Sequence, residues 1–591
     1  MADQRERSLE ASSRTAEPAA LPSAVAGARA ERAPASADPA AAAEIRGGTV
    51  IARALKAQGV EYMFGIVGYP VYGVAAAAQK EGIQYFGFRN EQAASYAAGA
   101  VGYLTGRPGA CLTVSGPGMI HGLAGLANAQ SNCWPMLLVS GSSETYLEGK
   151  GAFQECPQVD AARIFSKYSA RPDSLRRVPI FVEQAVRATL YGRPGAAYLD
   201  LPSDQIDGRI DPAELEMPPR CPDPPRPLAD PASVERALDL LRTAQRPLVI
   251  VGKGAAYSRA EVEVRAFVER AGLPFLPTPM GKGMLRDDHP LCTAAARSFA
   301  LANADVVFLI GARLNWILHF GQPPRFAAGA RIVQLDIAAE EIGTNVPIEV
   351  ALHGDARSVM TQVLAAFDAA PFAHPASSAW RSGLAESGAK NTASVDAMMQ
   401  SDVEPMGYYR ALREIRDRLP QNAFLVCEGA NTMDISRTVL PNHEPRTRLD
   451  AGTFGTMGVG CGFAIAAAAV HPERKVVAVQ GDSAFGFSGM EVEVACRHGL
   501  PITWVVINNG GIGSGVSELD RRRIPTNVYL PDARYEKIIE AFGGRGFYVD
   551  SVAALGPALE QALRADVPTL VNVKIDPKAT RKPQPFAWLT R

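Results

Sequence analysis

Two runs of sequence decide the fold, Gly481-Asp-Ser-Ala-Phe-Gly-Phe-Ser-Gly-Met-Glu491 and Pro501-Ile-Thr-Trp-Val-Val-Ile-Asn-Asn-Gly-Gly511. Short apolar segments at residues 475–479 and 502–507 are typical of buried strands, and residues 489–498 between them are typical of a helix. Asp482 and Asn509 therefore each follow a strand, at the edge where open α/β sheets bind ligands. Their carboxylate and carboxamide oxygens are hard ligands, which suit Mg²⁺ bound to a diphosphate.

The spacing of these two residues resembles a known motif. Asp482 and Asn509 are 27 positions apart (509 − 482 = 27), and Gly-Asp followed at this distance by Asn-Asn resembles the metal and diphosphate motif of thiamine diphosphate (ThDP) enzymes. The resemblance implies ThDP and Mg²⁺ as cofactors, with the metal held by Asp482, Asn509 and the carbonyl of Gly511. Three further residues would border the cofactor: Gly481, Ile512 and Ser483, which replaces the usual glycine. Both dipeptides are also common in turns, so agreement with the rest of the chain decides the interpretation.

Alternating helix and strand patterns over residues 47–140 predict a parallel sheet with helices on both faces. A chain of 591 residues is too long for one core. With the resemblance, we expect an α/β fold of three doubly wound parallel-sheet domains of the ThDP-dependent decarboxylase type. The expected boundaries are a disordered leader 1–46, an N-terminal pyrimidine-binding domain 47–217, a linker 218–231, a central nucleotide- or CoA-associated domain 232–368, a linker 369–404, a C-terminal diphosphate and Mg²⁺ domain 405–577, and a tail 578–591.

Composition excludes several classes of partner. The net charge of −1 gives no indication of binding to nucleic acid or an anionic membrane. No apolar run of 18 residues is present, so we expect no membrane span. The eight cysteines are scattered without a Cys-x-x-Cys pair, which favours neither a zinc site nor a disulfide framework. The leader lacks the apolar region of a secretory signal, so we expect a cytoplasmic protein.

Glu91 lies in the segment Arg89-Asn-Glu-Gln-Ala-Ala94, which follows an expected strand and begins a helix. An acid at a helix start is favoured by the macrodipole in any protein. The segment also resembles the catalytic-glutamate segment of ThDP enzymes, in which this carboxyl hydrogen-bonds N1′ of the aminopyrimidine and promotes loss of the thiazolium C2 proton. An acid in an apolar cleft is suited to sharing a proton in this way, so Glu91 is the expected catalytic residue.

Loops that follow the strands of the first domain would form the substrate pocket. Residues 115–121 and 151–155 resemble family segments that line the cofactor cleft and approach the active centre. The pocket candidates are Val67, Gly68, His121, Phe153 and Gln154. His121 could equally be a satisfied histidine at a helix start.

The C-terminal domain contributes two more candidates. Gly455-Thr-Met-Gly458 resembles the segment whose apolar side chain wedges between the two rings of ThDP and forces its bent shape. Met457 is the expected wedge; a methionine in a glycine-rich loop otherwise fills a gap. Glu493 is a candidate for the substrate pocket. It lies two residues beyond Glu491 on one short helix, so the two acids point to different faces, and the sequence leaves open which one reaches the pocket.

The central domain has polar residues where its expected strands end. Lys253 and Arg313 suit phosphate groups, and Asp336 suits ribose hydroxyls. No complete Gly-x-Gly-x-x-Gly is present, so that route to dinucleotide binding has little support. The resemblance implies ADP, a CoA-derived nucleotide or no ligand here, and makes FAD unexpected. Arg581, in the basic tail that also holds Phe586 and Trp588, could close over a coenzyme A arm.

Over residues 47–591 the chain resembles 2-hydroxyacyl-CoA lyases most, and oxalyl-CoA decarboxylases next. The segments that carry the resemblance are 64–68, 89–94, 102–105, 132–135, 151–155, 191–196, 481–491 and 588–591. The implied reaction is cleavage, or reversible formation, of a 2-hydroxyacyl-CoA thioester to formyl-CoA and an aldehyde or ketone. Oxalyl-CoA decarboxylation is the alternative. An acetolactate-synthase-like carboligase and a non-catalytic ThDP-fold subunit fit the residues less well.

One departure from the relatives bears on the substrate. Where they usually have tyrosine, this chain has Gly513 in the run Gly510-Gly-Ile-Gly-Ser-Gly515. We hypothesise that Gly513 leaves room for a branched carbinol such as that of 2-hydroxyisobutyryl-CoA, which would yield acetone; loop flexibility is the alternative explanation. The resemblance further implies a homodimer or homotetramer with active sites at subunit interfaces, since the first domain of one subunit meets the third domain of another.

Overall fold

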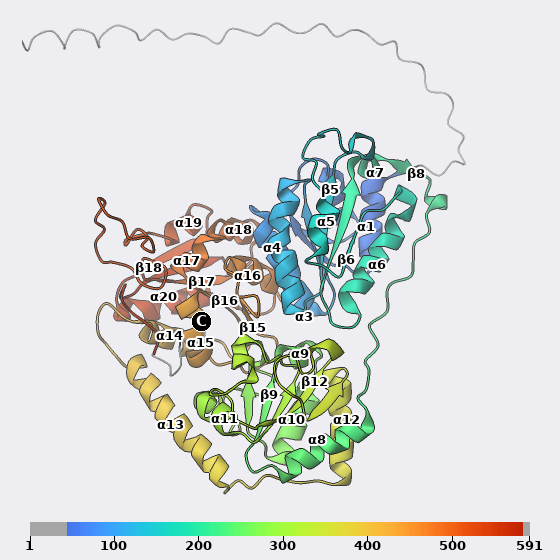
Figure 1. Ribbon diagram of the computed structural model, residues 1–591. Coiled ribbons are helices and arrows are strands. Elements are labelled where there is room, and N and C mark those ends of the chain that lie inside the picture. Colours follow the sequence, from blue (N-terminus) through green and yellow to red (C-terminus); the bar gives the residue numbers. More distant parts are fainter. Residues whose placement is uncertain (1–43, 583–591) are drawn as a thin grey trace, which may run out of the picture. The chain divides into compact units, whose positions relative to one another are not determined.

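The computed structural model describes residues 44–582 and contains three parallel sheets with helices on their faces (Figure 1). The expected fold class is confirmed. The leader up to residue 43 and the tail from residue 583, with Phe586 and Trp588, lie outside the described residues. None of the described helices is long and apolar enough to cross a membrane.

The N-terminal sheet has the strand order β3-β2-β4-β5-β7-β6, with every neighbouring pair parallel. Its strands are β2 (Tyr62–Gly65), β3 (Gln84–Gly87), β4 (Gly109–Thr113), β5 (Met136–Ser142), β6 (Tyr168–Ala170) and β7 (Ala196–Pro202). Its helices are α1 (Gly47–Ala57), α2 (Tyr72–Lys80), α3 (Glu91–Thr105), α4 (Pro117–Asn132), α5 (Gln158–Arg163), α6 (Val178–Leu190) and α7 (Ser203–Asp207). The loops that leave β3, β2 and β4 therefore emerge side by side at one sheet edge.

The central sheet has the order β10-β9-β11-β12-β13 and is also parallel. Its strands are β9 (Pro247–Val251), β10 (Phe275–Pro277), β11 (Val306–Ile310), β12 (Arg331–Asp336) and β13 (Val350–His353). Its helices are α8 (Pro231–Thr243), α9 (Lys253–Tyr257), α10 (Glu261–Ala271), α11 (Arg297–Asn303) and α12 (Ala356–Ala369).

The C-terminal sheet has the order β15-β14-β16-β17-β19-β18. Its strands are β14 (Phe424–Glu428), β15 (Arg448–Asp450), β16 (Val476–Gly481), β17 (Thr503–Asn508), β18 (Arg545–Val549) and β19 (Thr569–Lys574). Its helices are α14 (Tyr408–Arg416), α15 (Ala430–Val439), α16 (Val459–Val470), α17 (Asp482–Gly486), α18 (Val492–His498), α19 (Glu536–Glu540) and α20 (Val552–Arg564). Because β16 and β17 pair directly, with Gly481 opposite Ile507, Asp482 and Asn509 follow the ends of neighbouring strands.

Two segments are more ordered than their composition indicates. Ile45 and Arg46, at the end of the expected leader, form β1 and pair antiparallel with β8 (Arg209–Ile210). Residues 379–399, inside the expected second linker, form the helix α13 (Ala379–Met399). Ser378 caps this helix by accepting the Arg381 backbone N–H, and Trp380 near its start is buried. A capped first turn with a buried indole stabilises this helix.

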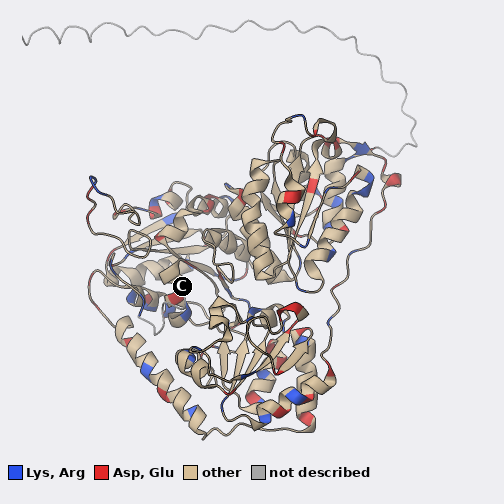
Figure 2. Cartoon of the chain, in the orientation of Figure 1, with Lys and Arg blue, Asp and Glu red and all other residues tan. Residues whose placement is uncertain are grey.

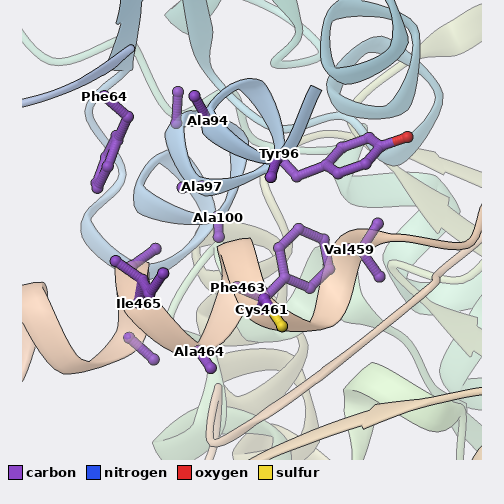
Figure 3. Close-up of a cluster of buried hydrophobic side chains, with 14 of the residues drawn as sticks. Phe64, Ala94, Tyr96, Ala97, Ala100, Val459, Cys461, Phe463, Ala464 and Ile465 are labelled. Carbon is purple, nitrogen blue, oxygen red and sulfur yellow. The ribbon is translucent and has the colours of Figure 1, made fainter. Parts of the chain in front are cut away.

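Helices α3 and α16 pack against each other and join the first and third domains within the chain (Figure 3). Glu91 is the only charged residue of α3, and α16 has none, so both helices are almost wholly tan in Figure 2. Small residues allow a close approach: a Cβ on Gly462 would lie 2.5 Å from the Ala93 carbonyl oxygen. Above this contact, the hydroxyls of Tyr96 and Thr456 lie 3.3 Å apart.

Candidate cofactor and substrate site

The three expected metal ligands meet at the ends of β16 and β17. The Asn509 Oδ1 position lies 2.8 Å from the Gly511 carbonyl oxygen and 3.1 Å from Asp482 Oδ1. In this orientation the Asn509 oxygen faces both of the other oxygens; turning the amide over would instead let it donate to both. Octahedral Mg²⁺ with ligands at about 2.1 Å places adjacent oxygens about 3 Å apart, whereas the longer bonds of Ca²⁺ require a wider spacing. The donor set and its spacing therefore fit Mg²⁺.

The Asp482 carboxylate is held in place by backbone groups. Its Oδ2 accepts the N–H groups of Gly510 at 2.9 Å and Gly511 at 3.1 Å, and Oδ1 accepts the Ser483 N–H at 2.8 Å. Burial raises the pKa of Asp482 to about 6 although these hydrogen bonds lower it. A bound cation would favour the ionised form. Ser483, the residue in place of glycine, has its hydroxyl 3.2 Å from that of Tyr529.

Met457 lies in a tight turn immediately before α16. The flanking Gly455 and Gly458 both have a positive φ, 70° and 92°, a backbone conformation that glycine adopts without strain. Gly458 is the N-cap of α16, and its N–H donates to the buried Glu428 carboxylate. A Cβ on Gly458 would lie 3.2 Å from the Phe487 side chain. The turn is therefore closely packed and presents Met457 at a defined position.

Glu91 begins α3, with Asn90 as the N-cap that accepts the Gln92 N–H. Glu91 Oε2 lies 3.0 Å from His121 Nδ1, and the Glu91 side chain is 13% exposed. A Cβ on Gly118 would lie 3.2 Å from Glu91 Oε1, so the glycine makes room for the carboxylate. The structure thus brings together the expected catalytic acid and the expected pocket histidine.

The remaining pocket candidates of the first domain lie on adjoining loops. Gly68 follows β2 and faces Val114, with 2.7 Å between its would-be Cβ and Val114 Cγ1. The Gln154 carbonyl accepts the Ser115 hydroxyl at 2.8 Å. Phe153 is 66% exposed, with its ring centroid 6.0 Å from that of Tyr69. Val67, two residues after β2, is half-buried and packs against the core of the first domain. All these loops leave the same edge of the sheet as Glu91.

Glu491 and Glu493 both face the turn before Glu91. Glu491 is 1% exposed, and its Oε2 accepts the Arg89 backbone N–H at 3.1 Å. Burial raises its pKa to about 7. Glu493 pairs with Arg497 at 2.9 Å and lies 3.9 Å from the Arg89 guanidinium; its hydrogen bond from Arg497 lowers its pKa. Within the described chain, both acids therefore hold the start of α3.

Gly513 lies beyond the metal ligands in an open position. No atom lies within 4 Å of a Cβ built on it, and its φ is +79°. The Asn431 side chain donates to its carbonyl at 3.4 Å. Neighbouring Ile512 is 56% exposed. There is space for a side chain at residue 513, but any residue other than glycine would be strained there.

A cavity of about 460 Å³ lies at the carboxyl ends of β9, β11 and β12 and also borders loops of the other two domains. Lys253, Arg313 and Asp336 all line it. Lys253 Nζ donates to Asn132 Oδ1 at 2.6 Å; burial, together with nearby Arg313, lowers the pKa of Lys253 to about 7. Arg313 donates to the Ser131 carbonyl at 2.8 Å. Burial raises the pKa of Asp336. The size and charges suit a mononucleotide.

Arg581 does not line this cavity. It pairs with Asp434 of α15 at 2.7 Å. Sequence reasoning gave no role to Asn132, whose Oδ1 accepts from both Lys253 and the Thr453 N–H, or to Tyr529. Asn132 belongs to a segment that carries the family resemblance, which was the available signal. Tyr529 had none, because the loop from residue 512 returns to Ser483 only in three dimensions.

Comparisons with known proteins agree with this geometry. Family models of the thiamine pyrophosphate (that is, thiamine diphosphate) enzymes match the N-terminal TPP binding domain over residues 45–163, the central domain over 234–363 and the C-terminal TPP binding domain over 428–573. The chain is 51% identical over 563 residues to 2-hydroxyacyl-CoA lyase 1 of Mus musculus, covering 93% of this chain and 97% of the relative. It is 44% identical to 2-hydroxyacyl-CoA lyase of Arabidopsis thaliana, covering 90% and 96%. It is 45% identical to oxalyl-CoA decarboxylase of Escherichia coli, covering 90% and 95%.

Proposed function

Because this chain belongs to the thiamine pyrophosphate enzymes, in the group that contains 2-hydroxyacyl-CoA lyases and oxalyl-CoA decarboxylases, we propose that it cleaves, or reversibly forms, a 2-hydroxyacyl-CoA to give formyl-CoA and an aldehyde or ketone. The single observation that carries the proposal is the oxygen triad of Asp482, Asn509 and Gly511, with its spacing of 2.8 and 3.1 Å. It is supported by an acid at the start of α3 and by relatives named as lyases.

Each residue of the site would have a separate role in the reaction. Bound ThDP would supply a thiazolium carbon that attacks the thioester and accepts the electron pair left by carbon–carbon cleavage. Asp482, Asn509 and Gly511 would hold Mg²⁺ and, through it, the diphosphate. Met457 would fix the bend of the cofactor, an orientation effect. Glu91 would hold a proton at N1′ of the aminopyrimidine, and His121, 3.0 Å from Glu91, would face the departing carbonyl compound.

We propose that the substrate is a 2-hydroxyacyl-CoA with a branched acyl chain, which would occupy the open position at residue 513. The empty space around Gly513 supports room for two methyl groups on the carbinol carbon, as in 2-hydroxyisobutyryl-CoA. Oxalyl-CoA decarboxylation remains the second candidate, favoured by the Escherichia coli relative. A tyrosine hydroxyl is absent at this position, which weighs against it.

We also propose that the central cavity binds ADP or another adenine nucleotide. Its lining includes Lys253 and Arg313, which suit phosphates, and Asp336, which suits ribose hydroxyls. The cavity volume of about 460 Å³ suits a mononucleotide better than FAD. The coenzyme A arm of the substrate would approach from the C-terminal domain, where Arg581 pairs with Asp434 of α15.

A second copy of the chain would complete the catalytic site. Among residues 44–582, no hydrogen bond or ion pair joins Glu91 or His121 to Asp482, Asn509 or Met457. Exposed apolar side chains flank both half-sites: Tyr69, Ile120 and Phe153 in the first domain, and Phe454, Phe487, Met490 and Ile512 in the third. Exposed apolar groups gathered around incomplete sites are typical of an interface, so we propose a homodimer or a dimer of dimers.

A direct assay tests the reaction. With ThDP and Mg²⁺ present, 2-hydroxyisobutyryl-CoA, a straight-chain 2-hydroxyacyl-CoA and oxalyl-CoA are offered in parallel. We expect formyl-CoA with acetone or an aldehyde, abolished in Glu91→Ala. Turnover of oxalyl-CoA alone would replace the lyase proposal with a decarboxylase.

Complementation tests the shared site. Glu91→Ala and Asp482→Ala chains are each expected to be inactive, but random pairing makes half of the dimers mixed, and each mixed dimer would have one intact site. Mixing should therefore restore about a quarter of wild-type activity if the site spans two chains. If mixed dimers of verified composition remain inactive, both residues belong to a site within one chain.

A further inference from the structure

Glu428 is a buried acid that the proposed chemistry does not use. It ends β14, is 0% exposed, and directs its carboxylate away from solvent toward the first turn of α16. Its Oε1 accepts the N–H groups of Gly458 and, at 3.1 Å, Val459. Its Oε2 accepts the Gly460 N–H at 2.9 Å. One carboxylate thus satisfies three consecutive backbone donors that a helix start leaves unpaired.

The fourth partner connects the same carboxylate to the metal-binding strand. Gln480 Nε2 donates to Glu428 Oε2 at 2.7 Å, and Gln480 lies two residues before Asp482 on β16. The next residue, Gly429, also lies against this strand: its would-be Cβ is 3.2 Å from the Gly481 nitrogen. Glu428 is therefore bonded both to the turn that presents Met457 and to the strand that presents Asp482.

The atoms around the Glu428 carboxylate are closely packed. A Cβ on Gly460 would lie 2.5 Å from Glu428 Oε2, so only glycine fits there and the helix backbone can approach the acid. All four donors point at the carboxylate, and a protonated carboxyl would turn an O–H toward N–H groups. Burial nonetheless raises the pKa of Glu428 to about 7. An ordinary helix cap would be a small side chain in the preceding loop; here the cap comes from a neighbouring strand.

We propose that Glu428 is a positioning residue for the cofactor: its carboxylate fixes the distance between the Met457 turn and the Asp482 motif, and so the geometry in which bound ThDP is bent over Met457 while its diphosphate is held through Mg²⁺. The proposal rests on the proposed binding of ThDP but not on the identity of the acyl substrate. Glu428 would touch neither ThDP nor substrate and would act through the backbone of residues 458–460.

The test is isothermal titration of ThDP, with Mg²⁺ saturating, into the apo wild-type protein and four variants. Glu428→Gln keeps the shape but replaces one acceptor oxygen with a donor; it should raise the dissociation constant roughly tenfold or more, as expected when a buried charged acceptor is lost. Leu559→Ala is the control. It removes buried volume from α20, which packs against α14, β18 and β19 of the same domain, and it should lower the melting temperature but leave ThDP affinity within about twofold.

A double-mutant cycle separates positioning from general damage. Met457→Ala should weaken ThDP binding in the wild-type background and weaken it less in the Glu428→Gln background, because the wedge is then already misplaced. Full additivity of the two losses, or unchanged affinity in Glu428→Gln, would overturn the proposal. Absence of ThDP binding by the wild-type protein would instead overturn the proposed function, and the inference with it.

Discussion

Glu491→Gln is predicted to change how the stability of the apo protein depends on pH. Glu491 is 1% exposed and has a pKa raised from 4.5 to about 7 by burial. Below pH 4.5 the carboxyl is neutral in the folded and unfolded states, so its ionisation does not reduce the free energy of unfolding. As pH rises from 4.5 to 7, the unfolded chain loses the proton first, so the native state loses stability, and the loss is complete above pH 7.

The magnitude follows from the two pKa values. Their difference of 2.5 (7 − 4.5), at 1.36 kcal/mol for each pKa unit, corresponds to about 3 kcal/mol of stability lost between pH 4.5 and pH 8. Glutamine has the shape of the neutral acid and can still accept the Arg89 N–H, but it does not ionise. For a domain of this size the difference amounts to roughly 6 to 12 °C in melting temperature.

Differential scanning calorimetry of the apo protein at pH 5 and pH 8 is the assay. Because a chain of three domains need not unfold in two states, the transition of the C-terminal domain is compared, and the wild-type decline from pH 5 to pH 8 should exceed that of Glu491→Gln. Glu493→Gln is a matched control of opposite sign, since the bond from Arg497 lowers the pKa of Glu493. The stability that Glu493 contributes is present above pH 4.5 and is lost only as the pH falls through its lowered pKa, so Glu493→Gln should lose stability to a similar extent at pH 5 and at pH 8. Parallel curves for the wild type and Glu491→Gln would refute the reasoning.

Three further predictions concern ligands. Asp482→Asn removes the charged metal ligand and should weaken Mg²⁺-dependent ThDP binding by roughly 100-fold or more, measured by titration calorimetry; equal affinity would exclude the triad. Gly513→Tyr should suppress turnover of 2-hydroxyisobutyryl-CoA more than that of a straight-chain substrate. Gly513→Ala carries the same positive-φ strain without the ring, so a similar loss in both variants would point to strain instead of bulk. Lys253→Met should weaken ADP binding about 10- to 100-fold, as a lost charged hydrogen bond would, without changing ThDP affinity.

Much of the cofactor half-site could be predicted from the sequence because its parts are local. Asp482 and Asn509 each follow a short apolar run, and two successive buried strands with one short helix between them pair in parallel. Their side chains must therefore meet at one edge, as the pairing of Gly481 with Ile507 shows. Glu91 was accessible for the same reason, since Asn90 and Glu91 form a helix start directly after β3.

The contacts that escaped prediction are those whose partners are backbone groups or distant loops. Glu428 accepts three N–H groups at the start of α16. Almost every residue type has a backbone N–H, so the amino-acid sequence does not identify these groups as partners of Glu428. Asn132 joins Lys253 to Thr453 across 121 and 321 positions, which no periodicity encodes. Residues 369–404 were expected only as a linker, and the sequence analysis assigned no helix there; a serine cap and one buried tryptophan stabilise α13 within it.

The same distinction explains why Glu491 and Glu493 could not be told apart before the structure was known. Both are acids on one short helical segment, and helical geometry separates their directions without saying which direction is the pocket. Arg89, in the turn before Glu91, distinguishes the two acids. Its backbone N–H donates to Glu491, and its guanidinium lies near Glu493. Burial of Glu491 outweighs its backbone N–H partners and raises its pKa, whereas the hydrogen bond from Arg497 lowers the pKa of Glu493. The environment of each acid, more than its position in the motif, therefore sets its chemistry.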